Sequence, residues 1–472
     1  MSEVYLLLTA VVILGALLVS YRRTGDPLSP LVTFAPMLFY VYAYHPFVIQ
    51  FGEIPITTAM NSERSLFVAE TTSATNPLFS FFPRQGDVEY ILLVNLISVS
   101  AFCLGASYYR RSVGSEQRFR ILERAASPRV RQRFLQLSLV LGTLGFVAFW
   151  WLVSRSGGPV RMFSHPKPFL VSTSGYIGEM PMLTYPALLL LAATWQGQCL
   201  TLSRLLTLLY VASPQISWAI IGKRRGTIFL IAAMLAACWF LIKNKKPNWK
   251  VIIGGVGMLG LLLLFVVTHR QASPQEDLGL QATLTGSHPL TTGDEFVAAG
   301  ATILASEQYG HHFWGARACS MFVIRPIPSV FWPTKWQDMG LGWMETQPGL
   351  YGLTTSQWNA ALGFSPALGT AGGFVADAYL EWAWGGVLAC YCLGFGFSWL
   401  WKQWGLRGGV WTALYIEAMI LSIYLPSQSL GAWSYRFALL AVPTAIVFHV
   451  LIPHPSRRRS PVRYSRIPVQ TF

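Results

Sequence analysis

Charged side chains are scarce in this chain of 472 residues, where Asp, Glu, Lys and Arg together make up only 12%. An ordinary soluble domain holds roughly 25% charged residues, so this composition excludes one. Acidic residues are scarcer than basic ones: the chain has 20 Asp and Glu against 35 Lys and Arg, which gives a formal net charge of +15. Because the basic residues lie between long apolar runs, they indicate loops beside anionic lipid, and we reject a nucleic-acid surface.

Cysteine is also rare, and its positions imply no disulfide framework. Of the 6 cysteines only Cys319 falls in a long loop, and the others lie in or beside apolar runs. The paired His311 and His312 are not accompanied by an H-x-x-x-H, H-E-x-x-H or D-x-D stretch. The sequence therefore predicts no metal site and no other cofactor.

Long apolar runs are what the sequence has instead, with 53% hydrophobic residues and a mean hydropathy of +0.45. Runs of about 17 to 25 apolar residues are long enough to cross the hydrocarbon core as helices. They predict an all-α polytopic membrane protein, a single transmembrane domain over residues 1–472 with about eleven spans, near residues 4–20, 28–50, 88–109, 134–154, 181–197, 201–221, 227–242, 251–268, 373–400, 409–425 and 432–453.

Basic residues predict the orientation of these spans. Arg22 and Arg23 directly follow the first span, which favours a retained helix with its N-terminus outside. The basic segments 110–133 and 454–472 then face the cytoplasm, and residues 269–372 form a large extracytoplasmic loop. The stretch "DEFVAAGATILASEQYG" makes that loop partly helical and predicts a helix on the membrane surface or over a cavity.

The turn "GKRRG", residues 222–226, departs from this charge pattern because it faces outward between two spans. Its cations would lie beside the N-terminus of the next helix, and together these form an anion site suited to phosphate. Snorkelling interfacial side chains, or a miscounted helix that returns the turn to the cytoplasm, remain alternatives.

Two further stretches follow "GKRRG" in the chain: "RPIPSVFWPTKW", late in the long loop, and "DAYLEWAWGG", which opens the next helix. In this order the three resemble motifs of Wzy-type oligosaccharide repeat-unit polymerases, the O-antigen and exopolysaccharide polymerases of bacteria. The resemblance covers mainly residues 220–390. Ser329 stands where the family usually has Arg, and Asp377 where it has Glu.

The resemblance implies a GT-C-like membrane glycosyltransferase that acts at the outer face of the bacterial cytoplasmic membrane. Its substrates would be polyprenyl-diphosphate-linked oligosaccharides, as donor and as acceptor, and a chain-length regulator protein is an implied partner. An O-antigen ligase-like enzyme is the alternative within the same chemistry. A lipid-linked oligosaccharide transporter is the alternative of another class, although it predicts inverted repeats and charges near the midplane.

Cations are the first candidate site residues, because breaking a glycosyl diphosphate bond builds negative charge on the departing oxygen. We assign diphosphate binding to the basic residues of the turn and of the late loop motif, with Arg225 and Arg325 as the catalytic pair: Lys223, Arg224, Arg225, Arg325 and Lys335. Ordinary loop solvation is the alternative for Arg325 and Lys335.

Carboxylates and histidines are the second group of candidates, because an attacking hydroxyl benefits from a base. Asp377 is the first choice, and Glu381 shares its helix face at i, i+4. A structural ion pair between Asp377 and Arg436 is the alternative. His311, His312 and Arg317 are further candidates for sugar contact or acid–base chemistry; among the Trp residues of the loop, an interfacial belt is favoured over sugar stacking for most.

Overall fold

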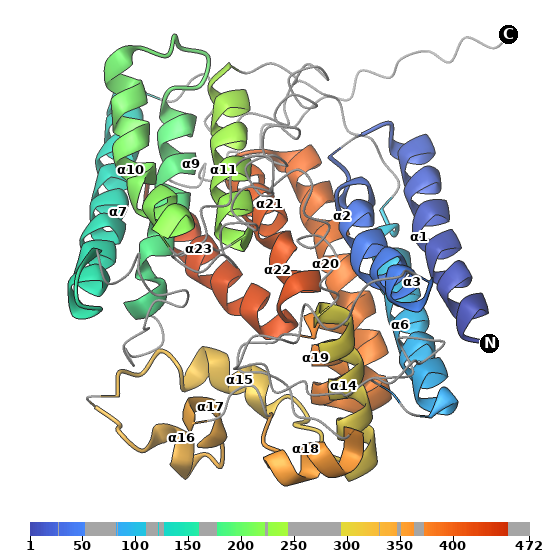
Figure 1. Cartoon of the computed structure of the whole chain (residues 1–472). Helices are drawn as coiled ribbons and strands as arrows, with labels where there is room; N and C mark the ends of the chain where they lie inside the picture. Colours follow the sequence, from blue (N-terminus) through green and yellow to red (C-terminus); the bar gives the residue numbers. More distant parts are fainter. Residues whose placement is uncertain are drawn as a thin grey trace, which may run out of the picture.

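The protein is represented by a computed structural model that describes residues 1–26, 28–51, 82, 84–109, 121, 127–159, 177–221, 225–243, 294–329, 331–346, 351–362 and 372–451. These residues form helices joined by turns (Figure 1). The predicted span at 251–268 and the basic tail 454–472 lie outside the described residues. So does most of the basic segment 110–133, whose last residues begin a helix.

The N-terminal helices confirm apolar runs as helical, but the second run is not one regular helix. Its pieces are an α-helix with Pro36 inside it, a short π-helix and a further α-helix. Proline has no N–H to donate and its ring crowds the preceding turn, which disturbs regular helix geometry. The elements are α1 (Ser2–Thr24), α2 (Pro30–Phe39), η1 (Tyr40–Tyr44), α3 (His45–Phe51) and α6 (Gln85–Ala106).

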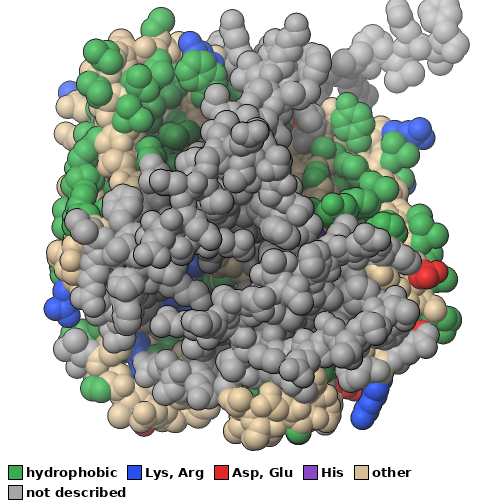
Figure 2. Space-filling view, in the orientation of Figure 1, with side chains coloured by type: hydrophobic (Ala, Val, Ile, Leu, Met, Phe, Trp, Pro, Cys, Tyr) green, Lys and Arg blue, Asp and Glu red, His purple; other side chains and the backbone are tan. Residues whose placement is uncertain are grey.

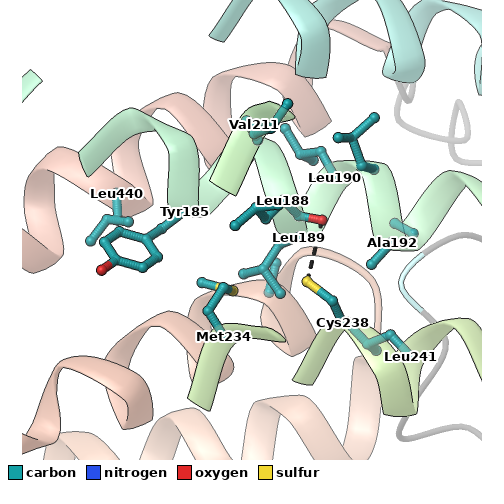
Figure 3. Close-up of a cluster of buried hydrophobic side chains, with 14 of the residues drawn as sticks. Tyr185, Leu188, Leu189, Leu190, Ala192, Val211, Met234, Cys238, Leu241 and Leu440 are labelled. Atoms are coloured by element: carbon teal, nitrogen blue, oxygen red, sulfur yellow. Dashed lines mark hydrogen bonds between the residues drawn. The ribbon is translucent and has the colours of Figure 1, made fainter. Parts of the chain in front are cut away.

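The middle of the chain forms a second group of helices, whose apolar core also includes residues of the C-terminal helices. The group consists of α7 (Pro128–Arg155), η2 (Ile177–Leu183), α9 (Thr184–Thr194), α10 (Leu202–Ile221) and α11 (Arg225–Lys243). Every residue of α9 is buried, so this helix lies at the centre of the group. Figure 3 shows its leucines facing Met234 and Cys238 of α11, and the Cys238 thiol donates to the carbonyl of Leu188 at 3.5 Å.

The described residues of the long loop form five helices, which gather at the lower end of the bundle in Figure 1. They are α14 (Asp294–Tyr309), α15 (Ala316–Val323), α16 (Lys335–Asp338), α17 (Trp343–Thr346) and α18 (Thr355–Leu362).

Helix α14 is confirmed as a helix; most of its residues from 296 to 306 are buried, whereas Glu307 and Gln308 in its last turn are exposed. A Cβ added to Gly300 would lie 2.8 Å from Ile91 of α6, so small residues let the helices approach closely. Its buried residues pack on α6 and α18 and begin with Phe296.

The C-terminal helices are α19 (Gly373–Trp382), η4 (Ala383–Gly385), α20 (Gly386–Arg407), α21 (Val410–Ile420), η5 (Leu421–Ile423), α22 (Tyr424–Ser427) and α23 (Leu430–Leu451). The predicted span 373–400 is therefore broken after ten residues of α19. Ala383 adopts φ 50°, a left-handed value that ends an α-helix. A Cβ on Gly386 would lie 2.6 Å from the carbonyl oxygen of Ala378, so α20 starts against the side of α19.

Helices α6 and α20 cross at glycines that bring their backbones into contact. A Cβ on Gly105 would lie 2.2 Å from the carbonyl oxygen of Tyr391, and one on Gly394 would lie 2.2 Å from that of Phe102. Small residues at a helix crossing are the usual device of membrane proteins, where close backbone packing replaces the hydrophobic driving force.

Within the described residues, five helical segments are long and apolar enough to cross a membrane: Ser2–Thr24, Gly86–Ala106, Pro128–Arg155, Gly373–Arg407 and Leu430–Leu451. Apolar side chains gather on the flanks of the molecule, over α7 and α10 on one side and over α1 on the other (Figure 2). On α1 these exposed residues include Leu7 and Leu14, and on α7 Val140 and Val147. Exposed apolar faces of this extent are suited to lipid, so the coarse prediction of a helical membrane protein is confirmed.

Candidate functional site

A buried ion network joins the long loop to the broken helix α19. Arg317, in the first turn of α15, donates through Nε to Oε1 of Glu381 at 2.7 Å and through Nη2 to Oδ1 of Asp377. The three side chains are 10%, 2% and 6% exposed. The two carboxylates therefore share one face of α19, as their i, i+4 spacing predicts, and one guanidinium spans both.

Backbone amides complete the coordination of both carboxylates. The N–H of Gly431 donates to Oδ2 of Asp377 at 2.9 Å, and the N–H of Gly315 donates to Oε2 of Glu381 at 3.1 Å. All four carboxylate oxygens thus accept a hydrogen bond. Burial alone would lower the pKa of Arg317, but the two carboxylates raise it, and the guanidinium stays charged. This coordination suits a structural ion network better than a base awaiting a proton.

The predicted alternative partner of Asp377, Arg436, belongs to a second cluster, which we call the arginine pair. Arg436 on α23 approaches Oε1 of Glu179 at 3.3 Å through Nη2, and Arg325, just beyond α15, approaches the same oxygen at 3.9 Å. The Tyr435 hydroxyl donates to this oxygen at 2.8 Å. Two guanidinium groups therefore converge on a single carboxylate.

Aromatic rings and one amide hold the arginine pair in place. The guanidinium carbon of Arg325 lies 4.2 Å from the ring centre of Tyr435, and that of Arg436 lies 4.2 Å from the ring centre of Tyr424. Arg436 also donates from Nη1 to Oε1 of Gln428 at 2.6 Å. Guanidinium groups stacked on rings keep their edges available for oxygen ligands.

The charges of the two clusters differ in sign. Arg317 with Asp377 and Glu381 sums to one negative charge, whereas the arginine pair with Glu179 sums to one positive charge. At Glu179, burial favours the neutral acid, but the positive charges of Arg436 and then Arg325 outweigh it and lower the pKa of the carboxyl. Glu179 is therefore ionised at neutral pH, and among the described residues the cluster has one positive charge in excess.

Lys335 contacts residues of its own loop segment. It is 1% exposed, and its Nζ donates to the carbonyl of Ile327 and lies 5.5 Å from the ring centre of Trp336. These contacts connect the two ends of the proline-rich stretch that precedes α16. They favour a structural role for Lys335 over the predicted diphosphate contact.

The paired histidines are used locally within the loop. Nε2 of His311 lies 2.9 Å from the carbonyl oxygen of Tyr351, and Nδ1 of His312 lies 3.2 Å from that of Tyr379. In the part of the chain that the structure describes, no group of three or more His, Cys, Asp or Glu side chains converges as metal ligands would.

Most of the basic turn at residues 222–226, the first predicted anion site, lies outside the described residues. Lys223 and Arg224 lie outside the described residues, and Arg225 is described only as the first residue of α11. Its side chain, like the predicted phosphate contacts of the whole turn, lies outside the described part of the chain.

Sequence reasoning did not predict Arg436 of the arginine pair, or its partner Glu179, as site residues. Arg436 carried a usable signal, because a charged residue inside an apolar span is costly and is usually functional or paired. Glu179 had a weaker one, since it immediately precedes the apolar run that becomes α9. Their meeting depends on the packing of η2 against α23, which no local pattern encodes.

Comparisons with protein-family models, with curated proteins and with solved structures find no match for this chain. The fold and the described residues thus define a helical membrane protein in which α15 joins a buried ionic cluster to a partly buried one. Function is therefore inferred from the chemistry of these clusters.

Proposed function

We propose that the protein is a membrane glycosyltransferase of the Wzy-type polymerase kind, acting at the outer face of a bacterial cytoplasmic membrane. It transfers a glycan from a polyprenyl diphosphate onto the sugar of a new lipid-linked repeat unit. The supporting sequence features are the three motifs in order and the charge bias that directs the long loop outward.

The arginine pair is the observation that carries the proposal. Arg325 and Arg436 converge on one carboxylate and keep one net positive charge, at 21% and 12% side-chain exposure. Two forked guanidinium groups with fixed edges suit the paired oxygens of a diphosphate. Arg325 belongs to the late loop motif that suggested a diphosphate contact.

The chemistry that the pair would serve is departure of the lipid diphosphate. An acceptor hydroxyl oxygen bonds to the anomeric carbon and gives its proton to the solvent, while the bond from that carbon to the diphosphate oxygen breaks and the diphosphate keeps the electron pair. The leaving oxygen becomes more negative in the transition state, so cations fixed beside it accelerate the step. Each charge-assisted contact contributes about 1.5–3 kcal/mol, equivalent to roughly ten- to a hundredfold in rate.

The test is transfer by purified protein in lipid vesicles, with a synthetic polyprenyl-diphosphate repeat unit as substrate and the product ladder as readout. Arg436→Gln and Arg325→Gln are each expected to slow the ladder about ten- to a hundredfold. Arg407→Gln is the matched control, because Arg407 is exposed at the end of α20 and contacts the ring of Trp411. It should act at the parental rate.

Glu179→Gln separates ligand binding from simple structural support. Removing this carboxylate raises the charge of the cluster by one unit, so a diphosphate should bind more tightly and the KM for the donor should fall. If the arginines only hold the fold, Glu179→Gln should impair transfer as the arginine variants do. That result, or ladders at the parental rate from both arginine variants, would refute the proposed site.

The same vesicles distinguish the alternatives. A single transfer to a different acceptor, without a ladder, indicates the ligase-like enzyme. Movement of the lipid-linked unit across the bilayer, with no new glycosidic bond, indicates the transporter. Either product pattern would overturn the polymerase.

A further inference from the structure

We infer that an exposed surface around Glu307 binds a sugar ring of the acceptor glycan. This surface, which we call the Glu307 surface, combines that carboxylate with rings from three other segments: Tyr90, His312, Trp314, Tyr379 and Trp384. The inference deepens the proposed function and rests on it only where it names the bound glycan as the acceptor. The binding of a sugar by itself does not depend on it.

A hydrogen-bond chain orients the carboxylate. The Tyr379 hydroxyl donates to Oε2 of Glu307. The Tyr90 hydroxyl lies 2.5 Å from that of Tyr379 and also interacts with the Glu307 carboxylate. The Glu307 side chain is exposed, and a carboxylate can accept several hydrogen bonds at once. An oriented acceptor is thus presented to an external hydroxyl group.

The aromatic rings form one continuous set, which includes the two tyrosines that contact the Glu307 carboxylate. The centroid of Trp384 lies 5.9 Å from that of Tyr90 and 6.1 Å from that of Tyr379, and His312 lies 5.7 Å from Tyr379 and 6.1 Å from Trp314. The two indoles at the ends of the set are the exposed members, with Trp314 at 71% and Trp384 at 41%.

The combination favours a sugar over lipid. A pyranose has apolar C–H faces, which stack on indole rings, and hydroxyl groups, which need oriented acceptors such as a carboxylate. Binding sites with aromatic walls and a few placed polar groups have this composition. A lipid-facing aromatic belt would not require an ionisable carboxylate held by two tyrosine hydroxyls, because a charge there is costly.

Backbone contacts attach the Glu307 surface to the ion network. The N–H of Trp314 donates to the carbonyl of Glu381 at 2.6 Å, and the N–H of Phe313 donates to that of Leu380 at 3.1 Å. Trp314 adopts φ 51°, an unusual value for a residue other than glycine. The indole is therefore carried on backbone fixed to α19, whose Glu381 is bound by Arg317, and a preformed platform loses little entropy on binding.

The test is site-specific photo-crosslinking of the full chain in its native cells. A benzophenone amino acid is placed at position 308, whose native Gln308 is exposed beside Glu307, and separately at position 239, where Trp239 is exposed on the apolar helix α11. After irradiation, peptides are analysed by mass spectrometry for carbohydrate adducts. We expect a carbohydrate adduct at 308, none at 239, and a loss of at least tenfold at 308 when Glu307→Gln is added.

The same change is measured in the vesicle assay, where Glu307→Gln should raise the KM for the acceptor about tenfold, a loss of about 1.4 kcal/mol, with a smaller effect on kcat. Gln308→Ala is the matched control and should leave both constants unchanged. A product ladder without an adduct at 308 overturns this site and leaves the proposed function standing. An adduct without a ladder keeps the sugar site and overturns the polymerase. An adduct that Glu307→Gln does not reduce overturns the role of the carboxylate.

Discussion

Arg317 offers the sharpest test of whether the buried network supports the fold or performs chemistry. Its guanidinium is the shared partner of two buried carboxylates, Asp377 and Glu381. Arg317→Met replaces the guanidinium with an unbranched apolar side chain and leaves both carboxylates without their cation. Asp377→Asn keeps the shape and an acceptor for the N–H of Gly431, and leaves Arg317 paired with Glu381.

The two substitutions should differ in size because they leave different charges behind. Removing one partner of a buried ion pair costs about 3–5 kcal/mol, and Arg317→Met leaves two negative charges at 6% and 2% exposure. Asp377→Asn instead weakens one charge-assisted contact, with an upper cost of about 1.5–3 kcal/mol. It also removes the excess negative charge, which reduces the cost further.

Unfolding of the purified protein in mixed micelles, followed against the mole fraction of sodium dodecyl sulfate, gives the free energies. The double variant Arg317→Met with Asp377→Asn should be more stable than the sum of the two losses predicts. Contacting residues typically couple by about 0.5–3 kcal/mol. Equal losses for the two single variants, or strict additivity in the double variant, would refute the ion-network reasoning.

Transfer by the folded fraction then separates structure from catalysis. If Asp377 is structural, Asp377→Asn should retain the parental turnover per folded molecule, because the amide oxygen still accepts from the N–H of Gly431. A general base predicts a loss of at least about a hundredfold, the usual lower contribution of such a group. We expect the first outcome, since each oxygen of this carboxylate already accepts a hydrogen bond.

Three further outcomes follow from the packing and from the other carboxyl groups. Gly394→Ala should destabilise the protein by about 1–3 kcal/mol through overpacking, since its Cβ would lie 2.2 Å from a backbone carbonyl of α6, whereas Gly396→Ala on the same helix, with nothing within 4 Å, should be tolerated in the same thermal melt. Glu179 has a lowered pKa in the fold, so the stability it contributes is complete above its ordinary value of 4.5 and is lost as pH falls through the lowered one; melts from pH 7 downward should show an acid loss that Glu179→Gln flattens. Thr444→Val removes the 2.6 Å donor of the buried Glu417 and should cost about 1–3 kcal/mol in the same thermal melt; an unchanged melt would contradict a stabilising role of that bond.

Local sequence patterns predicted the helices well where a single helix face or a single apolar run determines the structure. The spacing of Asp377 and Glu381 correctly placed both on one face of a helix. Helix α7 begins at Pro128, six residues before the apolar span predicted at 134–154. The Ser127 side chain accepts from the N–H of Val130 at 3.3 Å, so the cap determines that end.

Features that depend on distant segments were not predictable in the same way. The apolar run continues through residues 383–385, so hydropathy gave no sign of the break between α19 and α20. That break accompanies the contact of Gly386 with the backbone at Ala378. Likewise the alternative prediction for Asp377 was an ion pair with Arg436, but Arg317 takes that position from a loop helix 60 residues away in sequence.

The two ionic clusters are linked by α15, and their distances suggest the order in which a ligand would engage them. Arg317 opens this helix and Arg325 follows its end, so a shift of α15 alters both clusters. Arg325 lies 3.9 Å from the shared oxygen of Glu179, whereas Arg436 lies 3.3 Å from it and also donates to Gln428. Arg325 therefore loses less when it turns to an incoming diphosphate. Under the proposed function we expect Arg325 to capture the anion first, while Arg436 stays with Glu179 and fixes the position at which the leaving oxygen is stabilised.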